Sequence, residues 1–326
     1  LALGGGEISP LEMAGAFGTL ANQGNFIRPF TIRRIENSAG NILFQEPTPD
    51  PAVTQVVRPA HAYLLSDILS DNSARQPEFG VNNGLVIPGH RVAAKTGTSG
   101  TTRNDVRDVW TIGYTPEVVT AVWVGNTNNE PMAPGESGSR TATPIWNNFM
   151  TQYLANRQPV DFVRPSSVVD IEICSDSGTR PGSACTDRRI ERFAEDQPPL
   201  PSERDFIQAV QLDQWTGLRA NEFCPESIYQ ASFFTLLVSG GEAVAARERT
   251  VAQNWLENTA AGQAWASARG IAVPLRLPPD QACDATTPRP QITISQPVEG
   301  SEVSGTVDIM GSVSAPGFGG YQVEYG

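Results

Sequence analysis

The sequence predicts an α+β fold: an antiparallel sheet flanked by helices, then a Cys-bearing mixed segment, then the start of a β-sandwich. Three patterns carry this prediction. A capped helix opens the chain, three strand patterns follow one another closely between residues 91 and 124, and alternating strand patterns return after residue 288. Proline-rich stretches separate these regions, so we expect domains at residues 1–157, 158–287 and 288–326.

The opening helix is predicted from Pro10 to Gln23. Ser9 stands at its cap, a proline fills the first helical position, and Glu12 completes a capping box. The next segment, residues 26–44, reads as a β-hairpin whose turn lies at residues 37–40. Both predictions depend on neighbouring residues only, since caps and turns are local signals.

A second helix begins at Pro59, and the sheet follows it. Its strands are predicted at residues 91–98, 109–114 and 118–124, and the short turn between the last two favours antiparallel pairing. Strand 118–124 is almost continuously apolar, which is typical of a strand covered on both faces, so helices are expected to flank the sheet. A helix at 144–153 is one expected cover. The apolar side of the Pro59 helix carries Leu64, Leu65, Ile68 and Leu69.

Helices and then strands are predicted in the last third of the chain, where Trp255 and Trp265 are expected to anchor the packing. The strands alternate between Gly and Pro turns, as in the first part of a small Ig-like β-sandwich. The last residues, 319–326, read as a strand without a partner, so we expect the sequence to be a piece of a longer protein. The predicted elements are helices at 244–257 and 260–269 and strands at 291–295 and 306–310.

Four cysteines lie at positions 174, 185, 224 and 283. None forms a C-x-x-C pair, and both histidines are far from them in sequence, so we expect no metal site. An even number of cysteines favours disulfides in an oxidising compartment. Of the possible pairings we favour Cys174–Cys185 with Cys224–Cys283, and four unpaired buried thiols remain the alternative.

The charge balance argues against one class of partner. The chain carries 35 acidic and 23 basic side chains, a formal net charge of −12, whereas a nucleic-acid binder normally presents a basic face. Of the 23 basic residues, 22 are arginine and one, Lys95, is lysine. Any chemistry that needs a lysine must therefore use Lys95.

The single lysine lies in the segment AAKTGTSG, residues 93–100. A lysine ammonium beside a serine nucleophile can support the local field and take part in proton transfer. Gly97 leaves space for a substrate backbone, the hydroxyls of Thr96 and Thr98 can bind a carboxylate, and the Thr98 N–H can stabilise an oxyanion. Because a strand sends Lys95 and Thr96 to opposite faces, one cleft can use both only at a sheet edge. We therefore predict an edge strand that lines a groove and accepts an extended peptide.

Lys-Thr-Gly is the third motif of the serine acyl-transferases that include penicillin-binding proteins and serine β-lactamases. The segments GGEISPLEMA (5–14) and FGTLANQG (17–24) resemble the helix that follows the second active-site motif of class A penicillin-binding proteins. The segments DVWTIGYTPE (108–117) and TAVWVG (120–125) resemble the two strands that follow Lys-Thr-Gly in that family. The resemblance covers about residues 1–155 and implies an incomplete transpeptidase-like fold. Less specifically, the remainder resembles C-terminal extensions of such proteins.

The resemblance implies a peptidoglycan D,D-transpeptidase that works through a serine acyl-enzyme. Its substrates would be stem peptides ending in D-Ala-D-Ala, β-lactams would bind at the same site, and no cofactor is implied. Lys95 and Thr98 would be catalytic, and Thr96, Gly97 and Thr98 would bind substrate. The protein would act at the extracytoplasmic face of the bacterial cell membrane, with cell-wall assembly proteins as further candidate partners. No apolar stretch approaches the roughly 20 residues of a membrane span, so a membrane anchor is expected only outside this sequence.

The sequence departs from the family pattern at the nucleophile. Ser-x-x-Lys needs a serine three positions before a lysine, and Val92 stands there instead. We therefore expect this chain alone to form no covalent adduct with a labelled penicillin. The segment Ser70-Asp71-Asn72 spells the second motif, Ser-x-Asn, but it lies at the end of the Pro59 helix and is interpreted as a helix terminator. The alternatives are a non-catalytic cell-wall-binding scaffold with a degenerate transpeptidase fold and, more weakly, a β-lactamase.

Two further patterns are interpreted as structural. Trp110 and Trp123 occupy strand positions and are expected in the core rather than at a ligand. The alternating charges from Asp187 to Arg192 are expected to form a solvated face.

Overall fold

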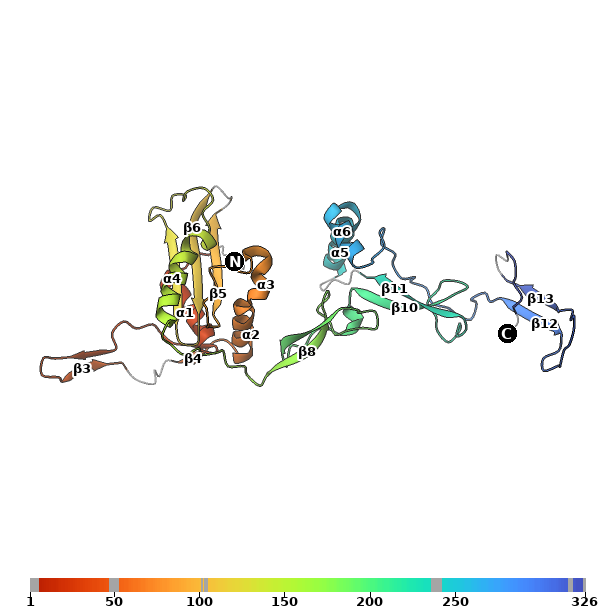
Figure 1. Cartoon of the computed structure of the whole chain (residues 1–326), viewed down its shortest axis with the longest axis horizontal. Coiled ribbons are helices and arrows are strands. Elements are labelled where there is room, and N and C mark those ends of the chain that lie inside the picture. The colour runs from red at the N-terminus through yellow and green to blue at the C-terminus, as the bar shows by residue number, and fades with distance from the viewer. Residues whose placement is uncertain are drawn as a thin grey trace. The chain divides into compact units, whose positions relative to one another are not determined.

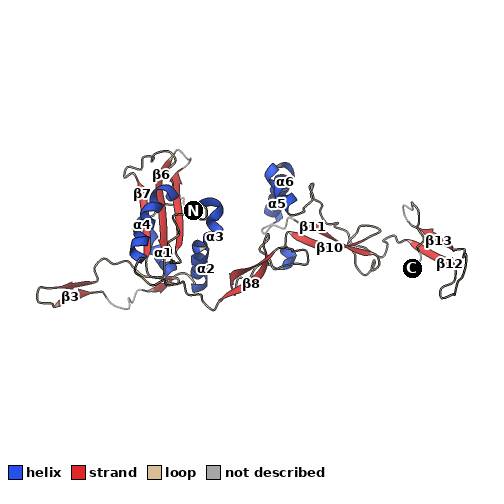
Figure 2. Ribbon diagram, viewed as in Figure 1, coloured by secondary structure: helices blue, strands red, loops and turns tan. Residues whose placement is uncertain are grey.

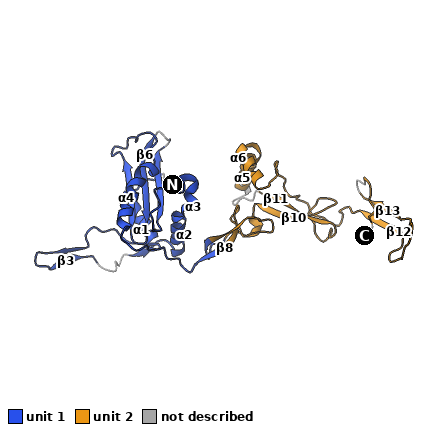
Figure 3. Cartoon of the chain, in the orientation of Figure 1, with its two compact units in different colours: residues 1–170, 192–198 blue, residues 171–191, 199–326 orange. Residues whose placement is uncertain are grey.

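The computed structural model of the chain describes residues 6–46, 53–100, 102, 105–235, 242–315 and 319–324 (Figure 1). Gly5, the first residue of the segment 5–14, lies outside these residues. The chain divides into two compact units (Figure 3). Unit 1 holds residues 1–170 and 192–198, and unit 2 holds residues 171–191 and 199–326.

The first helix, α1 (Pro10–Ala21), begins where its capping signals predict. The Ser9 hydroxyl accepts a hydrogen bond from the Glu12 N–H at 3.3 Å, and the Glu12 carboxylate accepts one from the Ser9 N–H at 3.0 Å. The chain turns at Gly24, whose φ is +90°. A side chain there would lie 1.9 Å from the Val57 carbonyl oxygen, so only glycine fits this approach of two backbones.

The predicted hairpin at 26–44 is shorter than expected. Its turn is confirmed, because the Asn37 side chain accepts hydrogen bonds from the N–H groups of Ala39 and Asn41. Phe26 does not join the hairpin and pairs with a later segment instead. The strands are β1 (Asn25–Phe26) paired with β4 (Thr54–Gln55), and β2 (Arg34–Glu36) paired with β3 (Ile42–Gln45).

The second helix, α2 (Pro59–Ser70), begins at Pro59 as predicted, and its predicted apolar side is buried in part, since Leu64 and Leu69 pack against the core cluster. Leu65 and Ile68 are 44% and 64% exposed. The helix also turns small and polar residues inward, and the buried Ser66 hydroxyl hydrogen-bonds the Tyr114 hydroxyl at 2.9 Å. Its buried residues are Ala60, Ala62, Tyr63 and Ser66. A further helix, α3 (Asn72–Phe79), follows directly and was not predicted.

The central sheet is antiparallel, with strand order β5-β6-β7, so β5 lies at an edge of this sheet as predicted (Figure 2). Helices cover both of its faces. Ala93 packs in one apolar cluster with residues of α1 and α2, whereas its neighbour Ala94 packs in another with Trp146 and Met150 of α4. Because neighbouring residues of a strand point to opposite faces, the sheet lies between two helical layers. The elements are β5 (Ala93–Gly100), β6 (Val106–Tyr114), β7 (Val119–Gly125) and α4 (Thr143–Leu154).

A short paired ladder follows, formed by β8 (Val168–Cys174) and β9 (Arg188–Ala194). The ladder belongs to both units, since the unit boundary falls after Asp170 and again before Arg192. Val168 and Ala194 are buried in the same cluster as Ala93. The first part of this ladder therefore completes the core of unit 1.

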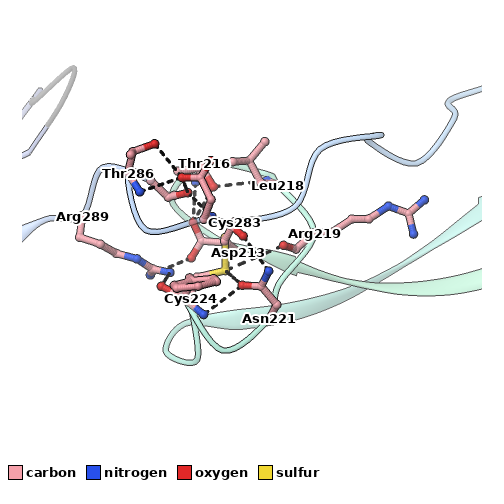
Figure 4. The surroundings of a disulfide bond; sticks show 12 residues. Asp213, Thr216, Leu218, Arg219, Asn221, Cys224, Cys283, Thr286 and Arg289 are labelled. Carbon is pink, nitrogen blue, oxygen red and sulfur yellow. Dashed lines mark hydrogen bonds and ion pairs between the residues drawn. A yellow bond between two sulfur atoms is a disulfide. The ribbon is translucent and has the colours of Figure 1, made fainter.

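Unit 2 contains the disulfides Cys174–Cys185 and Cys224–Cys283, which confirms the favoured pairing. Figure 4 shows the second of these with its hydrogen bonds: the Asn221 side chain donates to the Cys283 carbonyl oxygen at 2.6 Å, and Arg289 binds the buried carboxylate of Asp213 at 3.1 Å. The surrounding elements are strands β10 (Ile207–Asp213) and β11 (Ile228–Phe234), and helices α5 (Glu242–Asn258) and α6 (Ala260–Ala268).

The predicted helices of unit 2 are present as α5 and α6, and the packing role of their tryptophans is confirmed for one of the pair. Trp265 packs against Phe234 and the buried Leu256, whereas Trp255 is 42% exposed and contacts Trp265 from outside that cluster. Across the described residues, no helix has the length and apolarity that crossing a membrane requires.

The last described strands are β12 (Gln291–Gln296) and β13 (Met310–Ser314), which pair antiparallel. The first was predicted at 291–295, and the second begins where the prediction of 306–310 ends. The strand predicted at 319–326 is wrong over residues 319–324, which form no strand, and residues 325 and 326 lie outside the described residues. The alternating pattern thus located one strand and displaced another, because Gly and Pro turns shift the register between them.

Candidate active site

Lys95 lies on the exposed part of edge strand β5, two residues after the buried Ala93. Strand alternation sends its side chain to the face that α1 and α2 cover further down the strand. The ammonium group donates a hydrogen bond to the Thr96 carbonyl oxygen at 2.6 Å. The side chain of Lys95 is therefore at the surface and can be reached from solvent.

Thr96 and Thr98 lie on the opposite face of β5 from Lys95. The Thr98 hydroxyl oxygen accepts a hydrogen bond from the Gly138 N–H at 3.2 Å. Gly138 begins a short π-helix, η1 (Gly138–Ala142), that leads directly into α4. The sequence-predicted residues are thus adjacent on one edge strand, with the lysine and the two hydroxyls on different faces.

Gly138 contacts strand β5 on the face opposite Lys95, although no sequence pattern predicted it. Its carbonyl oxygen accepts hydrogen bonds from the hydroxyls of Thr111 at 3.3 Å and Thr143 at 3.0 Å. A Cβ atom on Gly138 would lie 2.5 Å from the Trp110 carbonyl oxygen and 2.8 Å from that of Gly97. Only a residue without a side chain can approach the sheet so closely, and a glycine just before a helix is the one sequence signal that marks it.

Gly97 accommodates a neighbouring indole. Its absent Cβ would lie 3.3 Å from Cβ and 3.7 Å from Cγ of Trp110 on the adjacent strand. The Trp110 indole N–H donates to the Asp108 carboxylate at 2.9 Å, which fixes the ring. Trp110 is half-buried and Trp123, its partner on β7, is 39% exposed, so the expectation that both lie in the core is wrong.

The Ser70-Asp71-Asn72 segment forms a helix boundary, as interpreted from the sequence. Asp71 ends α2 and caps α3, because its carboxylate accepts hydrogen bonds from the N–H groups of Ser73 at 2.8 Å and Ala74 at 3.2 Å. The Ser70 hydroxyl accepts a hydrogen bond from Arg91, which precedes strand β5, at 2.9 Å. The Ser70 hydroxyl is thus engaged at the base of the sheet.

The buried groups next to the strand have shifted pKa values. Burial raises the pKa of the Tyr114 hydroxyl, and its hydrogen bond with Ser66 opposes that shift only in part. At Arg91 burial alone would lower the pKa, but the hydrogen bonds and charges of Asp67 and Asp161 outweigh it and raise the pKa. The positive charge of Arg91 is therefore fixed near the start of β5 by Asp67 and Asp161.

Among the described residues, one group of side chains has the spacing of metal ligands: Cys174, Cys185 and Asp205. Both sulfur atoms are bonded to each other in the disulfide, so neither is a thiolate. This group therefore does not form a metal site in the oxidised protein.

Comparison with known proteins gives two family matches. Residues 1–151 match the penicillin binding protein transpeptidase domain, and residues 164–200 match the C-terminal domain of penicillin-binding protein 1A. The chain is 30% identical over 217 residues to penicillin-binding protein 1A of Vibrio cholerae, covering 55% of this chain and 26% of that protein. It is 27% identical over 254 residues to penicillin-binding protein 1A of Pseudomonas aeruginosa, covering 62% and 30%.

A solved structure is also similar, that of the PonA1 protein from Mycobacterium tuberculosis in complex with penicillin V. It shares 28% sequence identity at a TM-score of 0.41, covering 48% of this chain and 41% of that chain. The chain spans between about a quarter and a third of the length of the Vibrio and Pseudomonas relatives.

Proposed function

Since this chain belongs to the class A penicillin-binding protein family, we propose that it supplies the Lys-Thr-Gly wall of a peptidoglycan D,D-transpeptidase site. The observation that carries the proposal is the position of residues 95–98. They lie together on an edge strand, with Lys95 and Thr98 exposed, at the sheet that matches the transpeptidase domain.

Each residue has a role that its chemistry supports. The Lys95 ammonium would stabilise negative charge near the serine nucleophile and support proton transfer. Thr96 and Thr98 would bind the terminal carboxylate of the substrate. Because the Thr98 oxygen already accepts the Gly138 N–H, its own hydroxyl proton is available for donation to that carboxylate. Gly97 keeps the strand free of a side chain and seats Trp110 beside it.

The reaction is an acyl transfer. A serine that is not in this sequence would attack the amide carbonyl between the two terminal D-Ala residues of a stem peptide. The tetrahedral intermediate would collapse to a serine ester with release of one D-Ala, and the Thr98 N–H would stabilise its oxyanion. The amine of a second stem peptide would then take the acyl group and free the serine. A β-lactam would acylate the same serine as its own ester, and transfer to a second stem peptide would not follow.

The proposal extends to compartment and organisation. The disulfides are typical of an oxidising compartment, in agreement with action at the extracytoplasmic face of the bacterial membrane. Cell-wall assembly proteins would be further partners. We retain the proposed domains, residues 1–157 for transpeptidation, 158–287 as a Cys-bearing extension and 288–326 as an Ig-like module.

The test uses the full-length protein and a fluorescent penicillin. Lys95→Ala should reduce acylation by about 100-fold or more, since removing one preorganised electrostatic group commonly costs that much. Lys95→Arg keeps the charge but changes the shape, so it should restore only part of the rate. Arg157→Ala, which removes a cation stacked on Tyr153 in the same unit, is the matched control and should leave the rate unchanged. Unchanged acylation of Lys95→Ala would contradict the proposed role.

The second candidate is a non-catalytic cell-wall-binding scaffold, favoured by one observation: no Ser-x-x-Lys occurs in this sequence. The coding sequence upstream distinguishes the two. Ser-x-x-Lys and Ser-x-Asn there support the enzyme, and their absence supports the scaffold. For this 326-residue chain by itself, a stable serine-linked penicillin adduct would overturn the assignment of the nucleophile to an upstream segment.

A further inference from the structure

We propose that Asp67 is a positioning residue that connects the segment after residue 160 to the strand that carries Lys95. This inference rests on the proposed function of Lys95. Asp67 lies on α2, outside the Lys-Thr-Gly motif, and would fix the position of that motif on β5.

Asp67 lies near the end of α2 with only 13% of its side chain exposed. Its carboxylate accepts a hydrogen bond from a terminal guanidinium nitrogen of Arg91. Arg91 also donates to Ser70 at 2.9 Å and to Asp161 at 3.1 Å, and it stands two residues before the start of β5. The Arg91 side chain is therefore held to α2 just where the Lys95 strand begins.

The same carboxylate binds a second arginine from much later in the chain. Arg192 of strand β9 donates to both oxygens of Asp67 at 2.6 Å. Arg192 is 41% exposed, as the predicted solvated face requires, and it is also fixed by this ion pair. Hydrogen bonding to Asp67 raises the pKa of the Arg192 guanidinium. One carboxylate thus joins two cations, one at the base of β5 and one in the segment that matches the penicillin-binding protein 1A C-terminal domain.

The apolar surroundings join the same two parts of the chain. Phe162 and Val168 share a buried cluster with Ala93, the first residue of β5. The Arg91 guanidinium also lies over the Phe162 ring, 5.7 Å from its centroid. Segment 161–170 and the start of β5 therefore share one buried cluster. The Asp67 carboxylate supplies the negative charge that pairs with the two arginines beside it.

Removing the carboxylate would leave two guanidinium groups near each other without their shared anion. Arg91 would keep Asp161 and Arg192 would keep Asp170, but no anion would lie between the two like charges, so the arginines would move apart. Because Ser70, Asp161 and the Phe162 ring also hold the Arg91 guanidinium, part of this movement would be taken up by the backbone at the start of β5. Since a paired strand is stiff over four residues, the displacement would reach Lys95, and small misplacements of a catalytic group greatly slow reaction.

The test compares Asp67→Asn with Asp196→Asn in the full-length protein. Asp196 pairs with Arg58 at the cap of α2, so it joins the same two parts of the chain without touching Arg91. Asp67→Asn should slow the acylation step by about tenfold while the affinity of the preceding non-covalent complex stays within about twofold. Asp196→Asn should change neither, and Asp67→Glu should restore part of the rate.

A second readout does not depend on acylation. Amide hydrogen exchange in residues 93–98 should accelerate in Asp67→Asn and stay at the wild-type rate in Asp196→Asn. Two results would overturn the positioning role of Asp67. One is a wild-type exchange rate in residues 93–98 of Asp67→Asn, and the other is an equal loss of acylation rate in Asp67→Asn and Asp196→Asn. If the wild-type protein is not acylated at all, the proposed function fails, and the exchange measurement still decides whether Asp67 positions the strand.

Discussion

The backbone N–H of Gly138 donates a hydrogen bond to the Thr98 hydroxyl at 3.2 Å, from the face of the sheet opposite Lys95. The bond is possible because Gly138 has no side chain: a Cβ there would lie 2.5 Å from the Trp110 carbonyl oxygen. Gly138 of η1 thus supports strand β5 on the face opposite Lys95. The carbonyl oxygen of Gly138 is itself fixed by hydrogen bonds from Thr111 and Thr143.

Gly138→Ala should therefore displace the strand. Because the contacting atoms are backbone carbonyls that cannot rotate away, we expect at least about a tenfold loss of penicillin acylation in the full-length protein. Gly15→Ala is the matched control, since a Cβ at Gly15 meets only Phe26 at 3.8 Å inside helix α1. This control should keep its rate and gain about 0.5–1 kcal/mol in free energy of unfolding. Wild-type acylation by Gly138→Ala would contradict the supporting role.

The capping box of α1 gives a second prediction. Ser9→Ala removes the hydroxyl that accepts the Glu12 N–H, so the free energy of unfolding of unit 1 should fall by about 1 kcal/mol. Urea unfolding followed by tryptophan fluorescence measures the change. Ser9→Thr keeps an acceptor and should lose less than Ser9→Ala. Equal losses in the two variants would show that the hydroxyl does not cap the helix.

The two disulfides should contribute unequally to the stability of unit 2. Cys224–Cys283 closes 59 residues and Cys174–Cys185 closes 11, so the loop-entropy estimate gives about 4 and about 3 kcal/mol. Replacing the first pair by serine should lower the melting temperature of unit 2 more than replacing the second. The Asn221–Cys283 hydrogen bond in Figure 4 would reinforce this order, and the reverse order would contradict the loop-entropy argument.

Asp170 and Asp196 are two of the exposed carboxylates that contribute to the acid stability of unit 1. Hydrogen bonding to Arg164 lowers the pKa of Asp170, and hydrogen bonding to Arg58 lowers the pKa of Asp196. The unfolded chain therefore binds more protons at acid pH, so this stabilisation is complete above the usual carboxylate pKa of about 4 and is lost as the pH falls through the lowered folded-state values. Urea unfolding of Asp196→Asn should depend less steeply on pH below 4 than that of the wild-type protein. Identical slopes would exclude a contribution from Asp196.

Elements with local signals could be predicted from the sequence. The Ser9 cap, the Asn37 turn and the helix boundary at Asp71 all depend on residues a few positions apart. The edge position of Lys95 was also predicted, because strand alternation restricts how one cleft can use a Lys-Thr pair.

The remaining features depend on partners distant in sequence. Arg192 and its partner Asp67 are 125 residues apart, and no pattern within 187–192 distinguishes that arginine from its solvated neighbours. Leu65 was expected inside because it is apolar, yet its neighbour Ser66 is the residue that faces inward, where its hydroxyl hydrogen-bonds Tyr114. Gly138 was missed because a glycine required by close backbone approach looks the same in sequence as one in a loose loop.

The division of the chain limits how these parts could be exchanged by recombination. The backbone passes between the two units after residues 170, 191 and 198. A crossover before residue 168 would remove Val168 and Ala194 from the core they share with Ala93. A crossover just after Pro198 would keep unit 1 whole and carry Cys174 and Cys185 together. A chimaera that keeps unit 1 whole must therefore be joined after Pro198, and that join separates residues 171–191 from the rest of unit 2, where Asp176 pairs with Arg269.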